Sequence, residues 1–141
     1  EEIEKALAGA EVVIESEYHT QVQTHSAMES HGAVADFKPN QLTVWASTQG
    51  TASVRDELAA VFGLKKSQVR VITEFMGGGF GAKFGAGNTG MLATHLSKKA
   101  GAPVRLMCDR QEEHLGTGNR PSSNQKIRIG AKKDGRGSHN N

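Results

Sequence analysis

The sequence VRVITEFMGGGFGAKFG, residues 69–85, joins a short apolar run to a loop rich in glycine. Valine and isoleucine favour extended backbone, so the run at 69–73 predicts a strand. In the loop, three consecutive glycines precede Phe80, which lies between Gly79 and Gly81. Glycine permits positive φ and close approach of the backbone to a ligand. A polar ligand could therefore meet exposed backbone N–H groups just after this strand.

The glycine loop matches neither common phosphate-binding signature. A Walker A loop needs Gly-Lys-Ser/Thr, whereas Lys83 follows Ala82 and precedes Phe84. A dinucleotide fingerprint needs G-x-G-x-x-G, whereas the stretch that begins at Gly77 ends in alanine and holds a bulky residue inside the turn. From local chemistry alone, a tight structural turn and a loop that holds an anion or cofactor are both open.

Outward from the loop, hydrophobic periodicity predicts alternating strands and helices. Helix 51–62 carries Ser53 and Asp56 at the spacing of a capping box, and helix 88–100 has Leu92 and Leu96 on one face. The other predicted elements are a short helix ending at Gly9, strands 12–18, 32–37, 42–48, 104–109 and 125–133, and a helical turn at 111–115. This order indicates an α+β or mixed α/β fold, with helices that cover a sheet.

Composition fits an ordinary globular protein. The chain has 141 residues, 36% hydrophobic and 23% charged, with a net charge of +2. We expect one domain, no nucleic-acid partner and no membrane span, because no basic field and no run of about 18 apolar residues is present. Cys108, the single cysteine, lies in an apolar run and is expected to be a buried structural thiol. We expect residues 136–141 to be a polar tail that derives from a vector.

Several polar residues are candidates for a site. His25, Glu29 and His31 invite a metal-site interpretation, but a strand follows directly and no cysteine is near, so packing or hydrogen bonding is favoured and no metal ligand is assigned. Gln49 ends a predicted strand, where it is either an exposed turn residue or a hydrogen-bonding group. The charged residues that follow the strand at 104–109 are expected to form a surface cluster; they are Arg110, Glu112 and Glu113.

Four motifs, taken in order, resemble the molybdenum-cofactor-binding subunit of the xanthine dehydrogenase/aldehyde oxidase family, closest to its bacterial aldehyde-oxidising branch. They are His-Ser-Ala-Met-Glu-Ser-His at 25–31, Leu-Thr-Val-Trp-Ala-Ser-Thr-Gln at 42–49, Met-Gly-Gly-Gly-Phe-Gly-Ala-Lys at 76–83, and Pro-Val-Arg-Leu at 103–106 with Asp-Arg-x-Glu at 109–112. The resemblance runs over about residues 1–135, which it identifies as part of a molybdopterin-binding domain, the first lobe of that region.

The resemblance implies which residues form the site. Gln49 would hydrogen-bond the oxo group of the molybdenum, and Phe80 would wall the metal site; both are expected as catalytic residues. The cofactor would be lined by Gln49, Gly78, Gly79, Phe80 and Gly81. The cofactor would be molybdopterin, expected in its cytosine dinucleotide form, and iron–sulfur clusters and FAD would lie on other domains or subunits.

The implied activity is that of a molybdenum hydroxylase, which oxidises aldehydes or aromatic heterocycles with oxygen derived from water. Xanthine-oxidising members place a glutamate after the loop lysine, where this chain has Phe84, so an aldehyde or apolar aromatic substrate is expected. The catalytic glutamate base of the family lies far downstream, beyond the end of this chain. We therefore expect a fragment that alone neither holds molybdopterin tightly nor turns over.

Two other functions are compatible with the sequence. One is a non-catalytic anion- or nucleotide-binding module built on the glycine loop, and the other is an assembly domain that has kept the fold and lost the site. A gene that continues with another glycine-rich loop and a late glutamate would favour the enzyme. We expect a cytoplasmic location, with the periplasm as the alternative.

Overall fold

The computed structural model describes residues 1–137, which form two compact units. One unit comprises residues 1–23 and the segment from Pro121 onward, and the other comprises Thr24–Arg120. The elements in chain order are α1 (Glu2–Ala8), β1 (Val12–Thr20), β2 (Gly32–Lys38), β3 (Gln41–Ala46), α2 (Thr51–Phe62), the 3-10 turn η1 (Lys66–Gln68), β4 (Val69–Ile72), α3 (Gly87–Ala100), β5 (Val104–Met107), α4 (Arg110–Gly116) and β6 (Ser123–Ala131).

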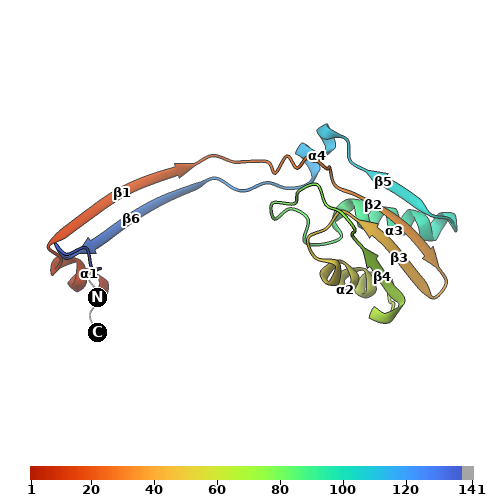
Figure 1. The fold of residues 1–141 in the computed structure, drawn as a ribbon, viewed down its shortest axis with the longest axis horizontal. Coiled ribbons are helices and arrows are strands. Elements are labelled where there is room, and N and C mark those ends of the chain that lie inside the picture. The colour runs from red at the N-terminus through yellow and green to blue at the C-terminus, as the bar shows by residue number, and fades with distance from the viewer. Residues whose placement is uncertain (138–141) are drawn as a thin grey trace. The chain divides into compact units, whose positions relative to one another are not determined.

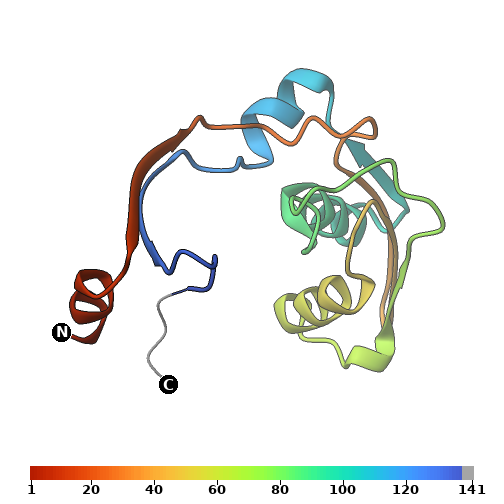
Figure 2. The same cartoon turned by 60° about the vertical axis from the view of Figure 1, so that its left-hand side comes forward.

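The larger unit contains a four-stranded mixed sheet in the order β4-β3-β2-β5 (Figure 1). Strands β2 and β3 form an antiparallel hairpin, β5 pairs antiparallel with β2, and β4 pairs parallel with β3. Helices α2 and α3 lie on the same side of this sheet (Figure 2). The predicted mixed α+β class with helices covering a sheet is confirmed.

The core lies between the sheet and these two helices. Leu42 and Val44 of β3 and Val54 and Leu58 of α2 are fully buried there. Because side chains alternate across a strand, Trp45 points to the opposite face and remains 42% exposed. Burial of α2 along its i, i+4 positions accounts for the agreement between its predicted and observed limits.

One predicted detail of the helices is wrong, the capping box of α2, and the face of α3 that carries its leucines is not the buried one. Helix α2 begins after the N-cap Gly50, and no side chain caps it, so Ser53 and Asp56 do not form a capping box. In α3, Leu92 and Leu96 are exposed, and the buried residues are the small ones: Gly90, Ala93, Thr94 and Ser97. The Ser97 hydroxyl accepts a hydrogen bond from the Phe37 N–H at 2.9 Å, so α3 approaches β2 too closely for leucine at that contact.

The smaller unit is a two-stranded antiparallel ribbon of β1 and β6, with helix α1. Its register runs from the Val12–Ala131 pair to the Thr20–Ser123 pair. Position 135, the predicted domain limit, stays a prediction, and most of the predicted polar tail, residues 138–141, lies outside the described residues.

Candidate functional site

Gln49 lies at the junction of the β3 end and the glycine loop. Its side-chain Oε1 accepts hydrogen bonds from two loop N–H groups, those of Gly81 at 2.9 Å and Lys83 at 3.3 Å. An amide nitrogen cannot accept these bonds, so the orientation of the carboxamide follows from its neighbours. The Gln49 Nε2 group has no hydrogen-bond partner within residues 1–137 and is a free donor on an exposed residue.

A second set of hydrogen bonds, to the Lys83 carbonyl oxygen, also holds the loop to the segment after β3. The Lys83 carbonyl oxygen accepts a hydrogen bond from the Thr48 hydroxyl and another from the Gln49 N–H, both at 2.8 Å. Gln49 therefore bonds the loop through both its side chain and its backbone. Of the two alternatives left open by the sequence, Gln49 is a hydrogen-bonding group, and it is also exposed.

The loop backbone has an unusual conformation. Gly78 and Gly81 have φ values of 104° and 90°, which L side chains rarely adopt. Phe80 has a φ of 51°, uncommon for a bulky residue, and its side chain is 69% exposed. Strained backbone of this kind persists where the surroundings hold it, and it is concentrated at ligand sites.

The loop presents donors that a polar ligand can use. The N–H groups of Gly78, Gly79 and Phe80 have no hydrogen-bond partner among residues 1–137, whereas the Gly77 N–H donates to Glu29 Oε2 at 2.8 Å. Successive free N–H groups form a concavity suited to anionic or carbonyl-like oxygens. Together with Gln49 Nε2, these donors fit an oxygen-rich cofactor. The structure thus brings together all five residues predicted for the site: Gln49, Gly78, Gly79, Phe80 and Gly81.

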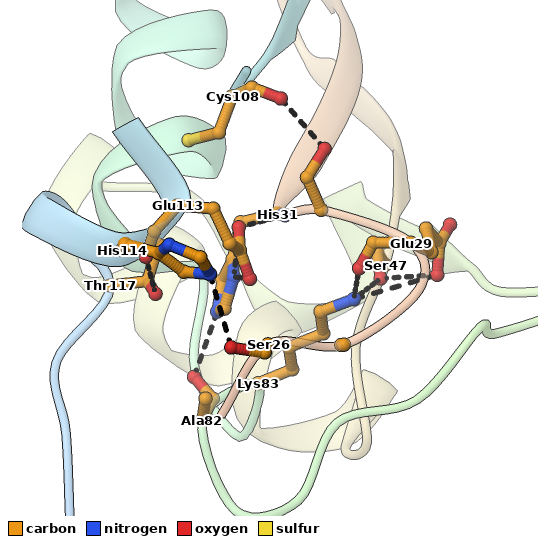
Figure 3. A network of polar contacts seen from close by, with 12 residues as sticks. Ser26, Glu29, His31, Ser47, Ala82, Lys83, Cys108, Glu113, His114 and Thr117 are labelled. Carbon is orange, nitrogen blue, oxygen red and sulfur yellow. Dashed lines mark hydrogen bonds and ion pairs between the residues drawn. The ribbon is translucent and has the colours of Figure 1, made fainter. Parts of the chain in front are cut away.

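Lys83 is the buried anchor of the loop, a role that the sequence did not reveal. Its side chain is fully buried, and Nζ donates to the Glu29 carbonyl oxygen and to Ser47 Oγ, both at 2.7 Å (Figure 3). The Ser47 hydroxyl in turn donates to Glu29 Oε2 at 2.7 Å. The lysine therefore joins the loop to the end of β3 and to the segment before β2.

Glu29 is ionised within this network. Partial burial raises its pKa, but hydrogen bonds from the Gly77 N–H and the Ser47 hydroxyl, with the charge of Lys83, outweigh burial and hold the pKa below its ordinary value. A lowered folded-state pKa means that the contribution to stability is present above the ordinary pKa and is lost as the pH falls through the folded-state value. The loop anchor is thus weakened by acid.

His31 and Glu113 form a second buried pair beside the loop. His31 Nδ1 lies 2.9 and 3.0 Å from the two Glu113 carboxylate oxygens, and the His31 backbone N–H donates to Glu113 Oε2 at 2.7 Å. His31 Nε2 lies 3.1 Å from the Ala82 carbonyl oxygen. Burial opposes ionisation of Glu113, but the His31 contacts and the charges of His31 and Lys83 hold its pKa below the ordinary value.

The predicted surface cluster is wrong for one of its three members, Glu113, whereas Arg110 and Glu112 are exposed. Glu113 is only 2% exposed, because α4 turns it toward His31. Arg110 donates to the carbonyl oxygens of Ala27 and Met28, at 2.7 and 3.0 Å. Residues 110–113 are all charged or polar, and this local pattern does not mark Glu113 as buried. Its partner, His31, is 82 positions away in sequence.

Cys108 lies directly after β5 and is half-buried, not fully buried as expected. Burial and then the nearby carboxylates of Glu113, Glu112 and Asp109 raise the pKa of its thiol. A thiol that is harder to ionise is a poor nucleophile, which agrees with the predicted structural role.

Comparison with known proteins places this geometry in a family. The model of the molybdopterin cofactor-binding domain matches residues 1–138. The aldehyde oxidoreductase molybdenum-binding subunit PaoC of Escherichia coli K12 is 35% identical over 131 residues, which are 93% of this chain and 18% of that subunit. The chain thus spans under a fifth of the length of this relative.

Solved structures show the same fold. CO dehydrogenase from Oligotropha carboxidovorans matches 94% of this chain with a TM-score of 0.82 and 29% identity, over 17% of its own chain. Quinoline 2-oxidoreductase from Pseudomonas putida 86 matches 94% with a TM-score of 0.79 and 29% identity, also over 17% of its chain. By the family match and by these likenesses, the chain belongs to the molybdopterin cofactor-binding domain family.

Proposed function

We propose that this chain is part of a molybdenum hydroxylase that oxidises aldehydes or aromatic heterocycles, and that it contributes Gln49 and the glycine loop to the molybdenum site. The observation that carries the proposal is the orientation of the Gln49 amide. Two loop N–H groups occupy its oxygen, so the NH2 group is left to donate beside the free N–H groups of the loop. These donors suit the oxygen atoms of a molybdenum cofactor.

Each site residue has a separate proposed role. Gln49 Nε2 donates to an oxygen of the cofactor, while the N–H groups of Gly78, Gly79 and Phe80 hold further oxygen atoms. The absence of a side chain at Gly81 leaves the space beside its backbone open, since an added Cβ would meet no atom within 4 Å. The Phe80 ring shields the site from water. When bound, the cofactor supplies the two-electron oxidising centre for transfer of a water-derived oxygen to carbon.

The proposed substrate is an aldehyde or an apolar heteroaromatic compound. Phe84 is 58% exposed near the loop and gives this position an apolar ring in place of a carboxylate. The names of two relatives, an aldehyde oxidoreductase subunit and a quinoline oxidoreductase, agree with this substrate class. Substrates that need a carboxylate partner, such as purines, would bind less well.

The proposal extends to groups outside this chain. We propose molybdopterin in its cytosine dinucleotide form, with iron–sulfur and flavin domains or subunits as electron-transfer partners, in the cytoplasm. Within residues 1–137, none of the helices has the length and apolar character needed to cross a membrane. The 141-residue chain by itself is expected to bind little cofactor and to be inactive, because an enclosing pocket provides most of the affinity for such a ligand.

Substitution of Gln49 in the full-length protein tests the proposal. Gln49→Glu keeps an acceptor oxygen for the Gly81 and Lys83 N–H groups but loses the NH2 donor. We expect a folded protein that retains molybdenum and turns over about a hundredfold more slowly, the usual cost of removing one donor from an active site. Gln49→Ala removes both contacts and should be at least as slow.

The matched control is Gln125→Ala, in the exposed strand β6, which should turn over at the unchanged rate. Normal turnover of both Gln49 variants would contradict the proposed site. A full-length protein that binds an anion at the loop but contains no molybdenum would instead support the alternative, a non-catalytic anion- or nucleotide-binding module.

A further inference from the structure

Both ring nitrogens of His31 face oxygen atoms. Nδ1 lies against the Glu113 carboxylate, at 2.9 and 3.0 Å, and Nε2 lies 3.1 Å from the Ala82 carbonyl (Figure 3). A carbonyl oxygen can only accept, so Nε2 must carry a hydrogen. A neutral imidazole has one donor nitrogen and one acceptor nitrogen, so Nδ1 could accept only from a protonated Glu113.

The surroundings favour the ionised carboxylate. Glu113 Oε2 also accepts the His31 backbone N–H at 2.7 Å, and the network holds the pKa of Glu113 below its ordinary value. An ionised Glu113 offers no proton to Nδ1. Two hydrogens on the His31 ring therefore satisfy all three contacts.

The charged groups around His31 balance in pairs. Lys83 is matched with Glu29, at 3.6 Å between Nζ and Oε2, and His31 with Glu113. Glu112 and Cys108 line a cavity of about 440 Å³ together with His31. Among the described residues, Glu113 is the only group of opposite charge within hydrogen-bond distance of the His31 ring. A buried glutamate without its cation would be destabilising, so each member of the pair requires the other.

We propose that His31, doubly protonated and paired with Glu113, is a positioning residue for the Gln49 amide. Its Nε2–H holds the Ala82 carbonyl, and Ala82 lies between the two residues whose N–H groups bond Gln49 Oε1. Fixing this short stretch of backbone aims both N–H groups at one oxygen and leaves the Gln49 NH2 group facing outward. The effect on the cofactor rests on the proposed function, whereas the protonation state of His31 does not.

The first test is spectroscopic. In full-length protein labelled with ¹⁵N-histidine, solid-state ¹⁵N NMR distinguishes protonated from unprotonated ring nitrogens, and subtraction of the His31→Gln spectrum isolates the His31 signals. We expect hydrogen on both nitrogens at neutral pH, and loss of one hydrogen in Glu113→Gln. An unprotonated Nδ1 in the unsubstituted protein would overturn the inference. If His31→Gln does not fold, magnetisation transfer from Nε2 to ¹³C-labelled alanine carbonyls assigns the signal instead.

The second test is molybdenum content and turnover per full-length chain. Loss of a residue that orients a contact to a metal site typically costs about tenfold to a hundredfold in affinity or activity. We expect a loss of this size in His31→Gln, a similar loss in Glu113→Gln, and no further loss in the double variant, because the two residues act as a unit. The control is His114→Gln, which should change neither quantity. Among residues 1–137, the His114 side chain bonds only the Ser26 hydroxyl, at 3.0 Å.

The two proposals fail in different ways. Normal content and turnover in folded His31 and Glu113 variants would overturn the positioning role, even if Gln49→Glu were slow. Normal turnover of Gln49→Glu, with two hydrogens on His31, would contradict only the proposed function.

Discussion

The Gln49 side chain packs directly against Gly79 and leaves no room for a side chain there. A Cβ at this position would lie 2.4 Å from Gln49 Cδ and Oε1, which is closer than real Cβ contacts. Gly79 is not among the residues with positive φ, so alanine here would act through this contact and not through backbone strain. We expect Gly79→Ala to displace the Gln49 amide and to slow the full-length enzyme by roughly a hundredfold, as misplacement of an active-site group by about 1 Å does.

The matched glycine control is Gly116→Ala, because a Cβ there would meet nothing within 4 Å. This variant should retain turnover. Gly79→Ala combined with Gln49→Ala should be no slower than Gln49→Ala alone, since both changes remove the same donor. If the double variant were slower than Gln49→Ala by the full factor of the Gly79→Ala loss, Gly79 would act by a route other than the Gln49 amide.

Single residues differ in how far their roles could be predicted. The position of Gln49 after a strand left an exposed turn residue and a hydrogen-bonding group both open, and only the family resemblance assigned it a contact in the site. Glu113 gave no such signal, because its neighbours are charged and its burial depends on His31, which is far away in sequence. A buried ion pair is a property of tertiary packing, which a local charge pattern does not contain.

Between elements, the Lys83 side chain links the loop, the end of β3 and the segment before β2. Lys83→Met keeps the aliphatic length but leaves the Glu29 carboxylate without its cation and two acceptors without a donor. We expect the free energy of unfolding to fall by about 3 kcal/mol, the lower end of the range for breaking a buried ion pair. Chemical denaturation of the full-length protein measures this change.

Lys99→Met is the matched control for this substitution. Lys99 is an exposed residue in the last turn of α3, and most surface substitutions change stability by less than about 0.5 kcal/mol. Equal destabilisation by both lysine variants would mean that the buried Nζ contacts contribute nothing.

Element limits were easier to predict than element faces. Helix α2 has the predicted limits because its apolar residues recur at helical spacing and Gly63 ends it in a left-handed conformation. Leucines normally mark the buried side of a helix, but Leu92 and Leu96 of α3 are exposed. Here the close approach to β2 selects Ala93 and Ser97 instead, and the partner that sets this distance is not encoded near the helix.

On the scale of the whole chain, the pairing of β1 with β6 could not be predicted. More than a hundred residues separate paired positions such as Thr20 and Ser123, and a single sheet was the simplest expectation from the element order. The alternation of Ile127 and Ile129 predicted a strand but not its partner. Contacts of such long sequence separation depend on the arrangement of everything between them.

The ribbon of β1 and β6 has little of its own core, which leads to a prediction for the isolated 141-residue chain. Ile14 and Ile129 are 60% and 57% exposed, and α1 has no buried residue. An isolated two-stranded ribbon is marginally stable in water, whereas the larger unit has a packed core. In hydrogen–deuterium exchange, we therefore expect the amides of β1 and β6 to exchange far faster than those of β2 and β3, which form the centre of the four-stranded sheet. Equally slow exchange in both sheets would contradict this prediction, because it would require the exposed isoleucines to be covered in solution.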